Sequence, residues 1–171
     1  MVGTVVTEKD RALLVAKYFI LQNTQNPKPT GLDQLKLQKL IYYAQAWNLV
    51  FNEDTLFENK IEAWVRGPVV PEVWRVFHGV ELKPLSPEDT KLVSESFSNK
   101  EKEILDDVWQ VYGKFDGPYL ETLTHQELPW QEARKNVPEY EASSNVISID
   151  LIQDYYTGLY KDAMAKSTKA S

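Results

Sequence analysis

The middle of the chain, residues 35–79, carries two different periods of apolar side chains. Residues 35–51 repeat them at three- and four-residue steps, which line one face of a helix: Leu37, Leu40, Ile41, Ala44, Trp47 and Phe51. Polar side chains fall outside this face: Lys36, Lys39, Gln45 and Asn48. Further on, Ile61, Ala63 and Val65 alternate with Glu62, Trp64 and Arg66, the period of a short strand. The segment therefore predicts a helix, an acidic loop and a strand in succession.

Proline, glycine and hydroxyl residues mark where other elements begin and end. Gly67-Pro68 is expected to reverse the chain after the strand, and Pro71 suits the first turn of a helix that Gly79 closes. Further start signals are Thr7, Ser86-Pro87, Ser98, Gly117-Pro118 and Pro129. Residues 151–160 have the pattern of a last helix, and Val146–Ile149 has the composition to pair with Ile61–Val65.

These signals predict a mainly α fold: a single compact domain of about seven helices with at most a short two-stranded β element. The helical domain is expected to span residues 7–160. Residues 1–6 form an N-terminal extension, and residues 161–171 a flexible C-terminal tail.

Composition narrows the classes of function. The chain of 171 residues has no cysteine, no signal-peptide pattern and no apolar run that would cross a bilayer. We therefore expect a cytoplasmic protein without a membrane partner. The net charge of −6 opposes binding to nucleic acid and favours a basic protein partner. We interpret Lys28, Lys36 and Lys39 as a solvated face of the helix start.

Catalytic chemistry finds little support in the sequence. His78 and His125 are far apart without metal-ligand spacing, and no nucleophile or phosphate-binding motif is present. We therefore predict no catalytic residue, no metal and no cofactor, and interpret His125 as a structural residue at a helix end. The alternative is a small hydrolase or transferase whose cleft includes His125 and nearby tyrosines.

Several segments of the sequence together resemble the motifs of one known family. The runs KLQKLIYYAQAW and IEAWVRGPVVPEVWRVFHG are followed by Val111–Gly113, Leu123–Trp130 and Ile149–Tyr156. In this order they resemble the Panacea domain, a family of antitoxins that includes SocA-like proteolytic adaptors, over roughly Thr7 to Leu159. The resemblance implies a bacterial or phage protein that binds and neutralises a toxin encoded by the adjacent gene, with a protease or its unfoldase as a further partner. A prophage-encoded regulatory binding protein and a nucleic-acid-binding regulator are the remaining alternatives.

The edge from Trp64 to Arg75 is the candidate interaction surface. Trp64 and Arg66 are expected to point outward beside a rigid turn. Tryptophan and arginine are residue types that dominate interface energetics. The alternatives are that the chain after Gly79 covers Trp64 and that Arg66 supports Glu53, Asp54 or Glu58 internally. The predicted partner-binding residues are Lys39, Trp64, Arg66, Val69, Val70, Glu72 and Arg75. The residues predicted to be structural are Trp47, Gly67, Pro68, Pro71, His125, Pro129 and Trp130.

Overall fold

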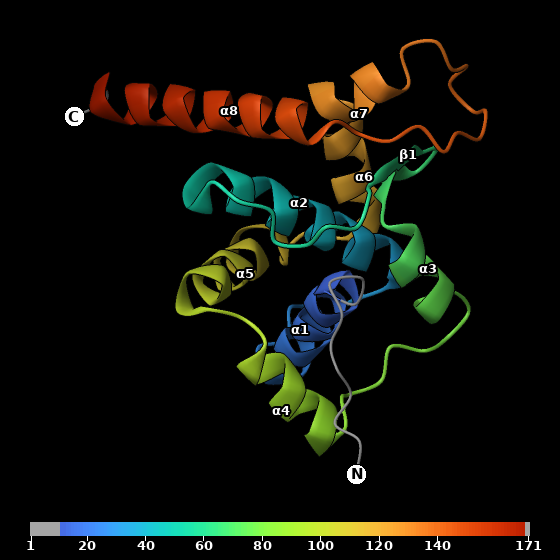
Figure 1. The fold of residues 1–171 in the computed structure, drawn as a ribbon, viewed down its shortest axis with the longest axis vertical. Coiled ribbons are helices and arrows are strands. Elements are labelled where there is room, and N and C mark those ends of the chain that lie inside the picture. The colour runs from blue at the N-terminus through green and yellow to red at the C-terminus, as the bar shows by residue number, and fades with distance from the viewer. Residues whose placement is uncertain (1–10, 170–171) are drawn as a thin grey trace.

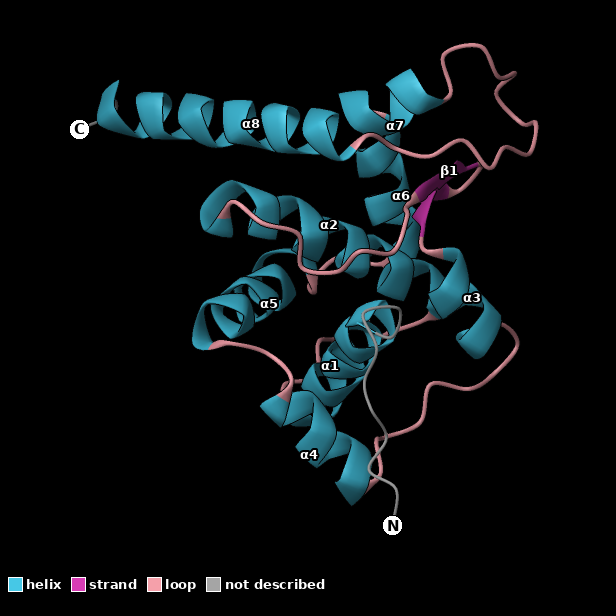
Figure 2. Ribbon diagram, in the orientation of Figure 1, coloured by secondary structure: helices cyan, strands magenta, loops and turns pink. Residues whose placement is uncertain are grey.

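A computed structural model describes residues 11–169 as a mainly helical fold with one small sheet (Figure 1). Its described part has eight helices: α1 (Arg11–Gln25), α2 (Gln34–Asn52), α3 (Pro71–Phe77), α4 (Pro87–Glu95), α5 (Asn99–Tyr112), α6 (Gly117–His125), α7 (Leu128–Ala133) and α8 (Ile149–Lys169). The two strands are β1 (Glu62–Trp64) and β2 (Gly67–Val69). Figure 2 shows the sheet at one end of the helices. The predicted fold class is confirmed.

α2 is the central helix, packed by α1, α3, α5, α6, α8 and β2. Because neighbours surround it, its polar face is buried as well as its apolar face. Lys36 and Lys39 have no exposed surface, so the prediction of a solvated lysine face is wrong for both. Phe51 lies at the end of α2 and is half exposed, although the pattern places it on the core face.

The sheet is a tight hairpin, with Glu62 opposite Val69 and Trp64 opposite Gly67. Its turn is formed by Val65 and Arg66, so the prediction that Gly67-Pro68 makes the turn is wrong. Gly67 begins β2 with a φ of 107°, where a side chain is strained, and an added Cβ would lie 2.5 Å from the Lys39 Cε. The backbone thus approaches the buried lysine closely.

Residues near Val146 extend this hairpin on its other side, as the sequence suggested. Glu62 forms an isolated antiparallel bridge with Val146. The Ala63 N–H donates to the Asn145 carbonyl, and the Ile147 N–H donates to the Ile61 carbonyl, both at 2.8 Å. Regular pairing is shorter than expected, and α8 already begins at Ile149.

Most predicted helix starts are confirmed by their caps. The side chains of Ser86, Ser98 and Asp116 accept backbone N–H groups at the starts of α4, α5 and α6. Thr7 and residues 1–6 lie outside the described residues. One helix end differs from the prediction, since α8 continues beyond Tyr160 to Lys169.

Candidate functional site

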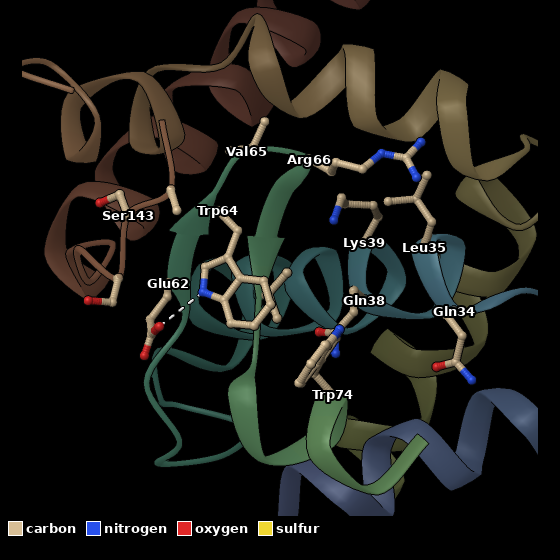
Figure 3. Close-up of a pocket in the computed structure, with 13 residues that line it drawn as sticks. Gln34, Leu35, Gln38, Lys39, Glu62, Trp64, Val65, Arg66, Trp74 and Ser143 are labelled. Carbon is tan, nitrogen blue, oxygen red and sulfur yellow. Dashed lines mark hydrogen bonds between the residues drawn. The ribbon is translucent and has the colours of Figure 1, made fainter. Parts of the chain in front are cut away.

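A hollow of about 660 Å³ opens beside the hairpin, where α2 begins (Figure 3). The lining residues come from α2, the hairpin, α3 and the loop before α8: Gln34, Leu35, Gln38, Lys39, Glu62, Trp64, Val65, Arg66, Val69, Trp74, Ala142, Ser143 and Ser144. The segment predicted to bind a partner therefore forms one wall of the hollow.

Two tryptophans dominate this wall. Trp64 of β1 and Trp74 of α3 meet edge to face, with ring centroids 5.4 Å apart. Trp64 is half buried, its indole N–H donates to Glu62 at 3.0 Å, and Trp74 keeps 37% of its surface exposed. The alternation holds for the buried Ile61 and Ala63 and the partly exposed Trp64, but not for Val65, which was predicted inward and is half buried in the turn.

Lys39 lies at the base of the hollow. Its Nζ donates to the Pro68 carbonyl at 3.0 Å, and burial lowers the pKa of the amine to about 7, assisted by Arg66 and opposed by Glu121. Lys39 lines the hollow but has no exposed surface, and its role as a contact residue remains a prediction. It ties α2 to β2.

Arg66 is exposed at the rim of the hollow and pairs with Glu121 of α6. Its Nη2 lies 2.8 Å from the Glu121 carboxylate, and its Nε donates to the same oxygen at 3.0 Å. The predicted alternative partners Glu53, Asp54 and Glu58 are therefore wrong. Arg75 is exposed on α3, one residue after Trp74.

The other predicted contact residues differ in exposure. Val69 is buried but lines the hollow, whereas Val70 is 1% exposed in the core, which contradicts its prediction as a contact. The Val70 backbone is clamped by Gln38, whose side chain accepts its N–H at 2.9 Å. Glu72 is half buried, and its Oε2 is enclosed without a hydrogen-bond partner.

Arg134 holds the loop that forms the opposite wall, and the sequence analysis missed it. Its guanidinium is 5% exposed and donates to the carbonyls of Ala63, Pro138, Glu139 and Glu141. β1 and the loop before Ala142 are thus fixed to one side chain. Because the sequence neighbours of Arg134 are mostly exposed, no hydrophobic period in the sequence indicates that it is buried. Its role becomes clear only from the carbonyl groups that it contacts in the folded chain.

The residues predicted to be structural lie mainly at junctions. Pro71 and Pro129 are buried in the first turns of α3 and α7. Gly67 and Pro68 form β2, as described above. Trp47 is partly rather than fully buried, and its indole donates to the Tyr112 hydroxyl at 2.9 Å.

His125 ends α6 and stacks on Trp130, with ring centroids 4.0 Å apart. The Trp130 indole donates to the Trp64 carbonyl at 2.9 Å, so the pair supports the hairpin from behind. Burial lowers the pKa of His125, although Glu121 opposes the shift, and its Nε2 has no hydrogen-bond partner. The ring is not part of the lining of the hollow.

A second polar cluster lies inside the core, away from the hollow. Tyr43 donates to Glu127 at 2.5 Å, and Tyr156 donates to Tyr42 at 3.1 Å. Burial raises the pKa of Glu127 to about 7, although the hydrogen bond from Tyr43 opposes this. Burial also raises the pKa of the Tyr43 hydroxyl, which the nearby Glu127 carboxylate raises further.

Three charged residues that line the hollow make contacts within the chain. Glu62 accepts from Trp64, Arg66 pairs with Glu121 and Lys39 donates to Pro68. Within residues 11–169, no cluster of histidine, aspartate and glutamate has the arrangement to hold a metal ion. None of the described helices combines the length and the hydropathy needed to cross a membrane.

Comparison with known proteins places the chain in a family. No curated protein and no solved structure matches it. The model of the family "Antitoxin SocA-like, Panacea domain" matches residues 37–131, which run from the first turn of α2 to α7 and include the two tryptophans of the hollow. This match confirms the resemblance, and the chain belongs to the SocA-like antitoxin family of Panacea-domain proteins.

Proposed function

We propose that this protein is an antitoxin that binds its cognate toxin directly, and that the hollow beside the hairpin is the docking face. The toxin is the product of the adjacent gene. The observation that carries the proposal is the partly exposed pair Trp64 and Trp74 within a preformed hollow of about 660 Å³. The family match supports the antitoxin role, and the hollow supports its location on the molecule.

The walls of the hollow suit docking because they are fixed before binding. Gln38 clamps Val70, Lys39 holds Pro68, and Arg134 holds the loop opposite. A preformed surface loses less conformational entropy when a partner binds. The hollow also combines a central aromatic pair with a charged rim, the usual anatomy of an interface centre.

Neutralisation in this proposal occurs by occlusion or conformational restraint, without catalysis. A hydrolase or transferase centred on His125 has less support, because that ring stacks on Trp130 and does not line the hollow. Its Nε2 is also buried without a hydrogen-bond partner in the described part of the chain. General acid–base catalysis needs a group within reach of the substrate.

The test is co-expression of the chain with the adjacent gene, measuring growth rescue and co-purification. Trp64→Ala and Trp74→Ala should each weaken the complex by about tenfold or more, since buried aromatic anchors dominate interface energy. Tyr119→Ala is the matched control, because Tyr119 is a half-exposed aromatic residue of α6 outside the hollow. Full rescue by both tryptophan variants would place the interface elsewhere.

Variants of Arg66 and Arg75 distinguish a role in the interface from a role in the fold. Arg75→Glu reverses an exposed charge beside Trp74 and should weaken neutralisation with little change in melting temperature. Arg66→Ala should act in the same direction, although it also removes the pair with Glu121. A parallel loss of stability and binding in both variants would show that these residues support the fold only.

Direct occlusion and delivery to a protease give different toxin levels. If the chain also serves as a proteolytic adaptor, the toxin's half-life should fall when the two proteins are co-expressed. If it acts by occlusion alone, the toxin should persist and co-purify. Trp64→Ala should abolish either result, because both begin with docking.

A further inference from the structure

The C-terminal half of α8 projects beyond the end of α2 (Figure 1). Ile152 and Tyr156 on the inner face of α8 are buried in the core. One turn later, Leu159 and Tyr160 on the same side are each 38% exposed, and Met164 after them is 50% exposed. The apolar stripe of α8 therefore continues onto residues 159–169, here called the α8 tip, where the fold provides less cover.

An apolar groove lies beside the α8 tip, between the end of α2 and α5. It encloses about 260 Å³ and is lined by Trp47, Phe51, Ile104, Asp107, Val108, Val111, Tyr112 and Tyr160. Phe51 and Val111 are about half exposed at its rim. The volume has room for one or two large apolar side chains. The groove and the hollow lie at opposite ends of α2, so they are separate surfaces.

The charges beside the groove and on the tip have opposite signs. Asp107 lines the groove, and Glu103 precedes it by one turn of α5. The tip carries Lys161, Lys166 and Lys169 against the single acid Asp162. None of these side chains takes part in an ion pair within residues 11–169.

We propose that two copies of this chain associate about a twofold axis, with the α8 tip of each copy lying in the groove of the other. The tip offers what the groove is suited to receive, an apolar helix face with excess positive charge. Because a twofold interface is isologous, each apolar and each charged contact occurs twice. The two tips would lie antiparallel beside each other and cover their exposed stripes.

Sedimentation equilibrium of the purified full chain across the micromolar range tests this arrangement. The expected result is a concentration-dependent dimer that Met164→Glu and truncation after Gly158 convert to a monomer. Met164 is half exposed, so the melting temperature of Met164→Glu in its monomeric form should remain near that of the wild-type chain. Val80→Glu is the matched control, since Val80 is also about half exposed and lies outside the groove.

A charge exchange tests the orientation of the tip. Glu103→Lys with Asp107→Lys should raise the dissociation constant of the dimer about tenfold, and Lys166→Glu with Lys169→Glu should do the same. The four changes combined in one chain should restore association, because each groove then meets a tip of the opposite charge. Trp64→Ala should leave the dimer intact, which separates this test from that of toxin docking.

Two results would overturn the proposal. One is a wild-type chain that stays monomeric at every concentration. In that case the groove would instead suit a basic amphipathic helix of another protein. The other is a dimer that survives Met164→Glu and the truncation.

Discussion

Lys36 illustrates how single side chains bring distant segments of this fold together. Its Nζ donates to the Thr30 hydroxyl and to the carbonyls of Gly31 and Gly113, and it lies 5.5 Å from the centre of the Trp109 ring. Burial lowers the pKa of this amine, although Asp33 and Asp116 oppose the shift. A buried cation is tolerated only with such partners. Lys36 therefore fixes the start of α2 to the end of α5.

Glu127 should make stability depend on pH. Its folded pKa is raised from 4.5 to about 7, so the folded state binds more protons than the unfolded state between these values. The free energy of unfolding should therefore fall as pH rises from about 4.5 to 7, by an amount on the order of 2 kcal/mol. Glu127→Gln keeps a neutral acceptor for Tyr43, so its melting temperature should change less across this window.

The measurement is thermal unfolding of both proteins at several pH values. Lys39 provides a check, because its lowered pKa gives a rise in stability above pH 7, outside the window of Glu127. An identical slope for wild type and Glu127→Gln between pH 5 and 7 would contradict the assignment.

Trp47 should contribute to stability less than a fully buried tryptophan does. It is half buried, stacks on Phe51 and donates to Tyr112. We expect Trp47→Ala to cost about 2–3 kcal/mol, below the roughly 3–5 kcal/mol of a fully buried ring. Trp47→Phe should cost about 1 kcal/mol, since it removes the hydrogen bond and keeps an aromatic ring. Chemical denaturation measures both values, and an unchanged Trp47→Ala would mean that the ring is not part of the packed interior.

At the scale of elements, the loop between α7 and α8 has no regular structure of its own and is held by Arg134. The planar guanidinium donates to carbonyls of β1 and of residues 138–141, a geometry that a lysine ammonium does not reproduce. The shape of the hollow's second wall therefore depends on a residue that does not touch the hollow.

Arg134→Lys should loosen this loop and weaken toxin binding while leaving the helices in place. We expect the free energy of unfolding to fall by about 1–3 kcal/mol, because several carbonyls lose their hydrogen-bond donor. Hydrogen exchange should become faster at the Ala63 and Ile147 amides, whose hydrogen bonds join the loop to residues 61–63, and should change little in α5. Equal acceleration in α5 would indicate global destabilisation instead.

Local signals account for the elements that the sequence predicted well. Ser98 with Glu101 forms a capping box within four residues, so the local sequence alone predicts the start of α5. The hairpin was misjudged because Gly67 serves a close approach to Lys39, and this contact spans α2 and β2. The Glu127–Tyr43 bond joins residues 84 positions apart, and nothing near either residue indicates it.

The candidate site was also predictable only where local sequence patterns indicate it. The alternating pattern identified Trp64 and Arg66, because period two is a local property of a strand. Trp74 was missed, since a residue on a short helix reveals its role only when the helix packs against the hairpin. The burial of Lys39 and Val70 was not predicted, because it depends on the surrounding helices.

At the scale of the whole molecule, the net charge of −6 should prevent binding to nucleic acid. Of the three lysines near the start of α2, Lys36 and Lys39 are buried, so they do not form a basic patch on the surface. We expect no measurable affinity for DNA or RNA at about 0.15 M salt, where surface electrostatics are not exaggerated. Fluorescence anisotropy with labelled duplexes checks this, and sub-micromolar binding that grows with duplex length would contradict it.

The central position of α2 also bears on how the protein is made. α2 is synthesised before α8, whose Ile152 and Tyr156 are buried in the core. A nascent chain therefore leaves the Tyr42 side of α2 uncovered until α8 has been synthesised. Contacts between such distant residues form slowly, because a long loop must close first. A chain cut short before α8 should consequently be a substrate for proteases and chaperones, and antitoxin activity should appear only after α8 has left the ribosome and packed on α2.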